Sequence, residues 1–294
     1  MTGFLAELGK KVAERWVAVL ILPGLVFTAV ATTAVVLGQR NWADAGLLWR
    51  RLIEFTTAAG GQQQADLART TVLLLVLLVA STGIGFVARS LGKPVEHLLA
   101  GRWPFFARPL AAALTERRRR TWNRLKREYQ NAEADGDHAR LGELAETRNA
   151  VALTEPRRPT WTGDRLHAPA TRVRKQYGLD LDAAWPRLWL LLPDSAREPL
   201  TESRRRFDEA TALGGWSVLY AALGVVWWPS AVIGLCVALV AWRRARAETE
   251  VYAELVEATV DVYLDDLLER FDDETRPIRP GRGRTVSERF RKAT

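Results

Sequence analysis

The residues that could do chemistry are few and scattered in this chain of 294 residues. His97, His138 and His167 stand far apart and lack the HExxH spacing of a zinc protease. The single cysteine, Cys236, lies in an apolar stretch, which favours a small packing residue over a nucleophile and excludes a disulfide framework. The sequence contains neither a GxSxG motif nor a phosphate-binding loop. It therefore predicts a protein that is not an enzyme and that uses no metal or cofactor.

Two runs match catalytic or cofactor motifs only in part. Residues 83–88 fit the glycine pattern of dinucleotide binding, but they follow an apolar helix where that motif requires a strand. We expect these glycines, with Ser81, to serve close helix packing. The acidic run 265–269 is similar to the magnesium–diphosphate motif of prenyl-transferring enzymes. That site needs a second acidic motif on a facing helix, whereas Asp272 and Asp273 follow on the same predicted helix. A solvated acidic face is the favoured interpretation.

The richest pattern lies in residues 159–193, where prolines, glycines, tryptophans and charges alternate. Thr160 is placed to cap the N-terminus of a helix, and Gly163 permits close approach of another backbone. Charged side chains beside tryptophans usually must be paired, so structural ion pairs are favoured over a ligand site formed by the charged members. The candidate structural or interaction motif comprises Pro159, Thr160, Gly163, Asp164, Arg165, Tyr177, Gly178, Asp180, Trp185, Pro186 and Arg187.

Within this segment the elements PTxxG, YGxD and WPRL follow one another in order. The order, with the layout of the apolar stretches, resembles an uncharacterised group of bacterial multi-pass membrane proteins that carry it between transmembrane pairs. The resemblance covers about 35 residues and the span layout. It implies that the segment lies in a cytoplasmic domain, and it implies no activity.

The elements that must position these residues are indicated by a segregation of charge. Residues 70–88 and 210–242 contain no charged side chain, whereas residues 89–206 carry 24 basic and 15 acidic ones. A soluble enzyme interleaves its charges, so this distribution excludes an ordinary one and predicts membrane spans around polar modules. The charge-free stretch 16–38 is a further span. The preference for Arg over Lys is typical of a GC-rich bacterial coding sequence.

The stretch 210–242 has two interpretations, one long tilted span or a hairpin with its tip at 227–230. Eleven Lys and Arg in 89–127 place that side in the cytoplasm, and a hairpin returns Arg243, Arg244 and Arg246 to it. The sequence thus predicts an all-α protein of the bacterial inner membrane, with four transmembrane helices in two pairs and both termini cytoplasmic. The predicted order is an interfacial helix with the first span (1–38), an extracytoplasmic loop (39–69), the second span (70–88), a basic cytoplasmic domain (89–206), the hairpin (207–242), an acidic cytoplasmic helix (243–274) and a disordered basic tail (275–294).

The basic domain should begin with an αα-hairpin, 110–131 and 139–153, that turns at 135–137. Its first helix carries a basic cluster close to the bilayer. The cluster helps to fix the topology and is placed to attract anionic lipid headgroups, and nucleic acid is not an expected partner. Its members are Arg117, Arg118, Arg119, Arg120, Arg124, Lys126 and Arg127.

Two predicted helices link these modules. Residues 197–206 should continue into the third span as one helix, and residues 248–274 combine an apolar stripe with an acidic face. The basic hairpin, in the same chain or in a second copy, is the expected partner of that acidic helix.

These features favour a non-enzymatic scaffold or signal-relay protein that assembles through its cytoplasmic helices, as a homo-oligomer or with a cytoplasmic protein. One alternative is an oligomeric channel or membrane-perturbing effector gated by the central domain. A lipid-modifying enzyme is the third.

Overall fold

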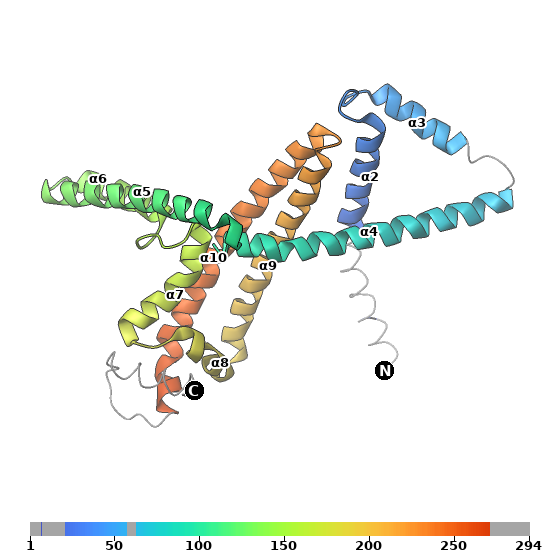
Figure 1. The fold of residues 1–294 in the computed structure, drawn as a ribbon. Helices are drawn as coiled ribbons and strands as arrows, with labels where there is room; N and C mark the ends of the chain where they lie inside the picture. Colours follow the sequence, from blue (N-terminus) through green and yellow to red (C-terminus); the bar gives the residue numbers. More distant parts are fainter. Residues whose placement is uncertain (1–6, 8–20, 58–62, 271–294) are drawn as a thin grey trace. The chain divides into compact units, whose positions relative to one another are not determined.

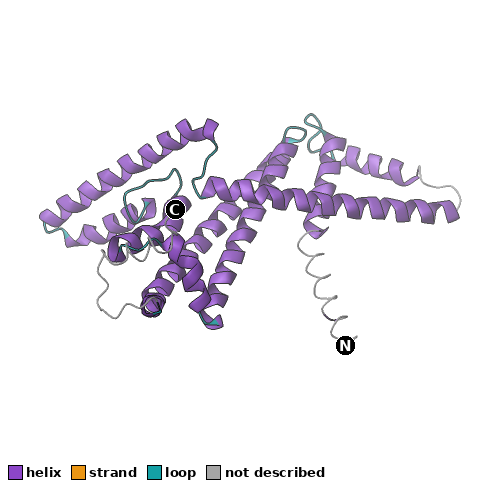
Figure 2. Cartoon of the chain, turned by 60° about the horizontal axis from the view of Figure 1, so that its bottom comes forward, coloured by secondary structure: helices purple, strands orange, loops and turns teal. Residues whose placement is uncertain are grey.

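The computed structural model describes residues 7, 21–57 and 63–270, and in that part of the chain all regular structure is helical (Figures 1 and 2). The all-α prediction is confirmed. The predicted interfacial helix, the basic tail and the Asp272–Asp273 pair lie outside the described residues. The helices are α2 (Leu22–Leu37), α3 (Ala45–Thr57), α4 (Gln63–Leu99), η2 (Phe105–Ala107), α5 (Arg108–Ala134), α6 (His138–Val151), α7 (Trp161–Tyr177), α8 (Leu181–Leu191), α9 (Asp194–Leu223) and α10 (Trp228–Glu269).

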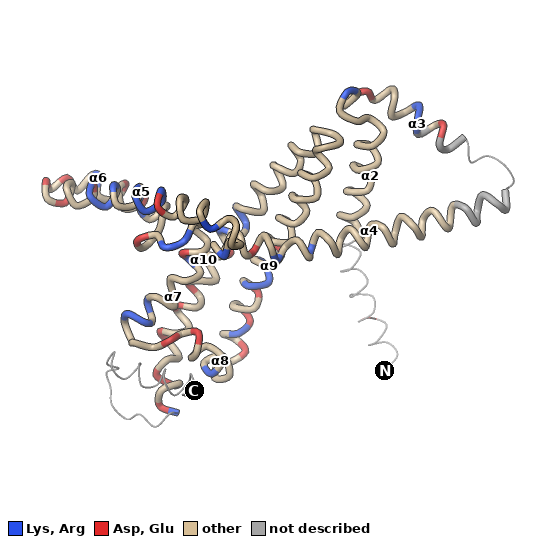
Figure 3. Tube along the Cα trace, in the orientation of Figure 1, with Lys and Arg blue, Asp and Glu red and all other residues tan. Residues whose placement is uncertain are grey.

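The chain divides into two compact units. Unit 1 consists of Met1–Val95 and Ala210–Trp242, and unit 2 of Glu96–Glu209 and Arg243–Thr294. Three helices, α4, α9 and α10, have residues in both units. Figure 3 shows that the charged residues of α9 and α10 gather in the unit 2 parts of these two helices, because residues 210–223 and 228–242 carry none.

The apolar helices differ in whether they are long enough to cross a membrane. By length and composition, one helix in the described part of the chain, Thr70–Leu99, could cross a membrane. The charge-free parts of α9 (210–223) and α10 (228–242) have 14 and 15 residues, about 21 to 23 Å of helix. A hydrocarbon core is about 30 Å thick. The four predicted spans are therefore not confirmed, because two of the helices are short for that distance.

The boundaries of α4 differ from the prediction. The sequence predicted a span of 70–88 after an extracytoplasmic loop, but α4 begins at Gln63 and continues to Leu99. Pro94 lies inside it without ending it. A proline lacks the backbone N–H and so removes one hydrogen bond of the helix, but the hydrogen bonds of the turns before and after it can keep the helix continuous. The first eleven residues assigned to the basic domain thus belong to a helix shared with the apolar unit.

In unit 1 the chain reverses between α9 and α10. The turn occupies residues 224–227, slightly before the predicted tip, because Pro229 falls in the first turn of α10, where its missing N–H costs nothing. The Ser230 hydroxyl donates to the carbonyl of Tyr220 at 2.9 Å. A Cβ atom on Gly234 would lie 2.8 Å from the backbone nitrogen of Ala221. The two helices therefore pack through small residues at close range.

Unit 2 has an aliphatic core formed by α7, α8, α9 and α10. Leu188, Leu200, Val260 and Leu267 are each at most 2% exposed within it. The apolar stripe of α10 is buried here, so its partners are α7, α8 and α9, and the predicted docking onto the basic hairpin is wrong. The reason is that α8, rich in leucine and tryptophan, offers far more apolar surface than the charged α5.

The αα-hairpin of unit 2 follows its prediction closely. Helices α5 and α6 lie side by side (Figure 1), and Gly136 between them takes a φ of 70°, the left-handed region that glycine enters without strain. Trp122 is buried at their contact with the following loop, where its indole nitrogen donates to the carbonyl of Ala152 at 2.9 Å.

Candidate functional site

The start of α7 is fixed by the residues that the sequence singled out. Thr160 caps the helix by accepting from the backbone nitrogen of Gly163 at 3.1 Å, and its hydroxyl donates to the carbonyl of Leu99 at 2.5 Å. A Cβ atom on Gly163 would lie 2.7 Å from the carbonyl oxygen of Ala100. Both local predictions, the cap and the close approach, are confirmed.

Asp164 and Arg118 hold the loop 152–160 against α5 and α7. One carboxylate oxygen of Asp164 accepts from the backbone nitrogens of Arg157 and Arg158, at 3.0 and 2.9 Å. The other accepts from Arg118 at 2.6 Å, and Arg118 also donates to the carbonyls of Val151 and Arg158. Both side chains are largely buried. Arg118 thus stabilises the loop through hydrogen bonds inside the protein.

That role corrects the prediction for the basic cluster. Arg118 shares a helix face with Trp122 and Leu125, which are buried, so it points into the protein and away from any lipid. The spacing of four and then three residues already contained this signal. Arg119 pairs with Glu155, Arg120 with Glu116, and Arg124 with Glu128, while Lys126 lies over the ring of Trp122. Within the described residues, Arg117 and Arg127 make no ion pair.

Arg165 joins α7 to the acidic face of α10. Its side chain is 4% exposed and donates to Glu250 at 2.8 Å and to Glu257 at 2.7 Å. Two turns further on, Arg172 donates to Glu257 at 3.0 Å and to Asp261 at 2.9 Å. Burial alone would lower the pKa of Arg165, but the bonds from Glu257 and Glu250 outweigh it and raise that pKa. Arg165 is therefore a charged, fully engaged structural group.

The other motif residues serve the joint between α7 and α8. Gly178 ends α7 in the left-handed conformation with a φ of 69°. Asp180 caps α8 by accepting from the backbone nitrogen of Asp182 at 3.2 Å. Arg187 donates to the carbonyl of Ala183 at 2.7 Å. Tyr177 donates to Asp261 at 3.4 Å, Trp185 packs on Trp189 with ring centres 6.1 Å apart, and Pro186 lies inside α8.

The charged motif residues therefore do not converge on one ligand. Asp164 and Arg165 are consecutive, yet Asp164 faces α5 and Arg165 faces α10. Asp180 caps α8 and also lies 3.9 Å from Arg174 of α7, whereas Arg187 donates to a carbonyl within α8. The ligand site that the sequence left open for these four residues has no common centre.

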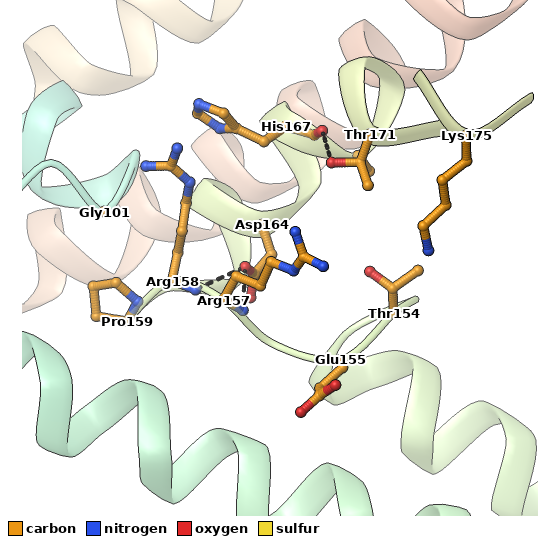
Figure 4. A pocket seen from close by; sticks show the side chains of 11 residues that line it. Gly101, Thr154, Glu155, Arg157, Arg158, Pro159, Asp164, His167, Thr171 and Lys175 are labelled. Carbon is orange, nitrogen blue, oxygen red and sulfur yellow. Dashed lines mark hydrogen bonds between the residues drawn. The ribbon is translucent and has the colours of Figure 1, made fainter. Parts of the chain in front are cut away.

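A cavity does lie beside them, between the loop 152–160 and α7. Its volume is about 400 Å³, and Figure 4 shows Arg157 and Lys175 pointing into it while Glu155 turns away. Burial lowers the pKa of Arg158, and the nearby charge of Arg102 lowers it further. Burial likewise lowers the pKa of His167, as does Arg158, so the imidazole is neutral at neutral pH.

Sequence reasoning missed the three cations of this cavity, Arg157, Arg158 and Lys175. Two adjacent arginines between Pro156 and Pro159 were a visible signal, because prolines restrict the loop that presents them. Lys175 gave no such signal, since a basic residue in the last turn of a helix is favoured in any case by the helix dipole.

Comparisons with protein families, with curated proteins and with solved structures find no match to this chain. Among the described residues, no group of three or more His, Cys, Asp or Glu is placed to hold a metal ion. Asp265 and Asp266 are exposed on α10, and Cys236 is exposed as well.

Proposed function

We propose that this chain is a membrane-anchored, non-enzymatic scaffold or signal-relay protein, in which unit 1 lies in the bacterial inner membrane and unit 2 in the cytoplasm. The observation that carries the proposal is the continuity of α9 and α10. Each begins or ends in a charged unit with its own core and continues without a break into the apolar unit. A change in the packing of unit 2 would then reach unit 1 through two stiff helices.

The surface of unit 1 supports the membrane assignment. Leucines and valines of α4 are exposed on every side over residues 72–79, which water would not tolerate in a contiguous patch of this size. Trp42, Trp227 and Trp228 cluster at the α9–α10 turn, where the Trp227 indole donates to the carbonyl of Trp42 at 3.0 Å. Indole rings prefer the membrane–water interface. The short arms of α9 and α10 would be accommodated by local thinning of the bilayer.

Unit 2 offers a lipid-facing edge of matching chemistry. Phe105 and Phe106 in η2 are 77% and 72% exposed, and the outer face of α5 presents Arg117 and Arg127. Aromatic rings beside arginines suit the headgroup layer of an anionic membrane. We place these residues at the cytoplasmic interface, in keeping with the resemblance to bacterial multi-pass membrane proteins.

The topology is tested by labelling single cysteines. Cys236→Ser removes the one cysteine of the chain, and Val225→Cys in the exposed turn and Gly142→Cys in α6 then report on the two units. A membrane-impermeant maleimide should label Val225→Cys in intact spheroplasts and Gly142→Cys only in inside-out vesicles. Labelling of both from the same side would contradict the four-span topology.

The relay is tested by weakening the ion pairs of unit 2 and measuring the labelling rate of a cysteine in unit 1. Glu250→Gln with Glu257→Gln removes the partners of Arg165, and the labelling rate of Val225→Cys should change at least about twofold if the helices transmit the change. Glu254→Gln, exposed on the same helix, is the control. An unchanged rate in a protein whose unit 2 has become sensitive to protease would contradict the relay.

Assembly through the cytoplasmic helices has its own test. Gly142 has open space around it in α6, so a cysteine there leaves the fold unchanged. A bifunctional maleimide should trap dimers of Gly142→Cys in membranes, and far fewer of Glu198→Cys, which is exposed on α9. The partner is either a second copy or a cytoplasmic protein. A monomer in both variants would exclude homo-oligomerisation through this hairpin.

The channel alternative gains no specific support. Ser217 and Ser230, which might have lined a pore, donate to the backbone carbonyls of Gly214 and Tyr220. Conductance of the purified protein in planar bilayers is the measurement that would revive it.

A further inference from the structure

The cavity between the loop 152–160 and α7 has an excess of positive charge. Three cations line it, and within the described residues Arg157, Arg158 and Lys175 make no ion pair. The two carboxylates on its wall are already used. Asp164 is held by Arg118 and by two backbone N–H groups, and Glu155 pairs with Arg119 outside the cavity. Neither carboxylate on the cavity wall therefore forms an ion pair with these three cations, which leaves them able to bind an anion.

Holding these charges together with so little negative charge nearby is unfavourable. Arg158 is half-buried, and its desolvation and the charge of Arg102 lower its pKa more than the carboxylate of Asp164 raises it. The protein nevertheless fixes the arrangement, because Asp164 clamps the backbone on which Arg157 and Arg158 are adjacent. A clamped loop loses little conformational freedom when a ligand arrives, so its charges are preorganised for binding.

From this charge, volume and preorganisation we infer that the cavity binds the phosphate group of an anionic ligand. Guanidinium groups bond phosphate oxygens in pairs, and Lys175 adds a point charge from the opposite wall (Figure 4). A second hollow of about 420 Å³ shares Thr154, Ala168, Thr171 and Lys175 with this cavity and is bordered by Leu153. The remainder of a phosphate ester fits there. The inference does not depend on the relay function.

Binding is tested on the full chain in nanodiscs of phosphatidylcholine, with inorganic pyrophosphate as the soluble probe, at constant ionic strength. Calorimetry should show saturable binding, and Arg157→Gln with Lys175→Gln should weaken it about a hundredfold, tenfold for each lost charge-assisted bond. Both side chains are exposed, so the variant keeps its fold. Arg140→Gln with Arg205→Gln removes the same charge from two surface positions that pair only with acidic neighbours three or four residues away, and it should leave the affinity unchanged.

The source of the phosphate is resolved by a second arm. If a lipid headgroup fills the cavity, nanodiscs with phosphatidylglycerol should compete with pyrophosphate in the original protein, and phosphatidylglycerol should copurify with it but not with the Arg157→Gln, Lys175→Gln variant. If a soluble phosphate compound fills it, pyrophosphate should bind equally in both kinds of nanodisc. Absence of saturable pyrophosphate binding in phosphatidylcholine, or an equal loss of affinity in the Arg140→Gln, Arg205→Gln control, would overturn the inference.

Discussion

Helices α9 and α10 pack against each other in both units, and they do so in two different ways. In unit 1 the closest contacts are made by glycine, alanine and serine, with a Cβ atom on Gly234 only 2.8 Å from the backbone of α9, and larger apolar side chains of both helices pack around Trp216 and Tyr220. In unit 2 the same helices bury Leu200 and Val260 in an aliphatic core, and α10 is also tied to α7 by Arg165. A single pair of helices thus changes its packing chemistry along its length.

This difference in packing between the two units is the difference expected between helices in hydrocarbon and helices in water. In water, burial of apolar surface drives helices together, so leucine and valine at the contact are worth most. In hydrocarbon that driving force is absent, and association depends on close van der Waals contact, which small residues permit. The leucines and valines of α4 over residues 72–79 are exposed, and the covered apolar side chains of unit 1 form only a small cluster around Trp216 and Tyr220. The proposed membrane location of unit 1 rests on this inversion as much as on helix length.

The largest effect should come from breaking the close packing of unit 1. A Cβ atom on Gly215 would overlap the carbonyl oxygen of Ala88, and the backbone of α4 cannot move aside without separating from α9. Gly215→Ala should therefore cost about 3 kcal/mol or more in the free energy of unfolding. Gly83→Ala is the matched control, because Gly83, which the sequence predicted to serve close packing, is exposed in α4 with open space around it. Equal melting temperatures of the two variants in nanodiscs would refute close packing as the basis of unit 1.

A somewhat smaller loss should follow from unpairing the arginine of unit 2. Glu250→Gln with Glu257→Gln leaves the buried charge of Arg165 without a carboxylate and should destabilise the protein by about 3 kcal/mol. Arg165→Met should cost less, because it removes the buried charge, keeps an apolar chain of similar length and leaves Glu257 paired with Arg172. Denaturant unfolding measures both. A larger loss for Arg165→Met would mean that the glutamates, and not the arginine, carry the desolvation cost.

The next largest loss of stability should come from weakening the hydrogen bonds by which Asp164 holds the loop 152–160. Asp164→Asn weakens the bond to Arg118 and the hold on the backbone of Arg157 and Arg158, at a cost of about 2 kcal/mol. The loop should open locally, and trypsin should cut faster after Arg157. Asp135→Asn, at the exposed turn of the αα-hairpin, is expected to leave that rate unchanged. A uniform increase in cleavage along the chain would instead indicate global unfolding.

Local features of the chain could be predicted from the sequence, whereas contacts between distant segments could not. Rules that act over three or four residues succeeded: the turn at Gly136 and the cap at Thr160 both depend on neighbours in the chain. The orientation of Arg118 was within reach of such rules, since Trp122 lies one turn away on the same face. The contacts of Arg165 with Glu250 and Glu257 were not, because charge alone does not say which basic helix an acidic helix will meet.

The smallest predicted effect concerns protons, and it should be confined to unit 2. Burial and the charges of Arg158 and Arg102 lower the pKa of His167, against a weaker opposing influence of Asp182 and a bond to the Gly163 carbonyl. Because the unfolded chain takes up a proton at about pH 6.5 and the folded chain resists it, the free energy of unfolding should fall as the pH drops from about 7 to about 5. His167→Gln should flatten this slope, whereas Gly83→Ala should not. Pyrophosphate should flatten it as well, since an anion beside Arg158 offsets the charge that opposes protonation. Identical slopes for His167→Gln and the original protein would show that His167 protonates as easily in the folded state as in the unfolded chain.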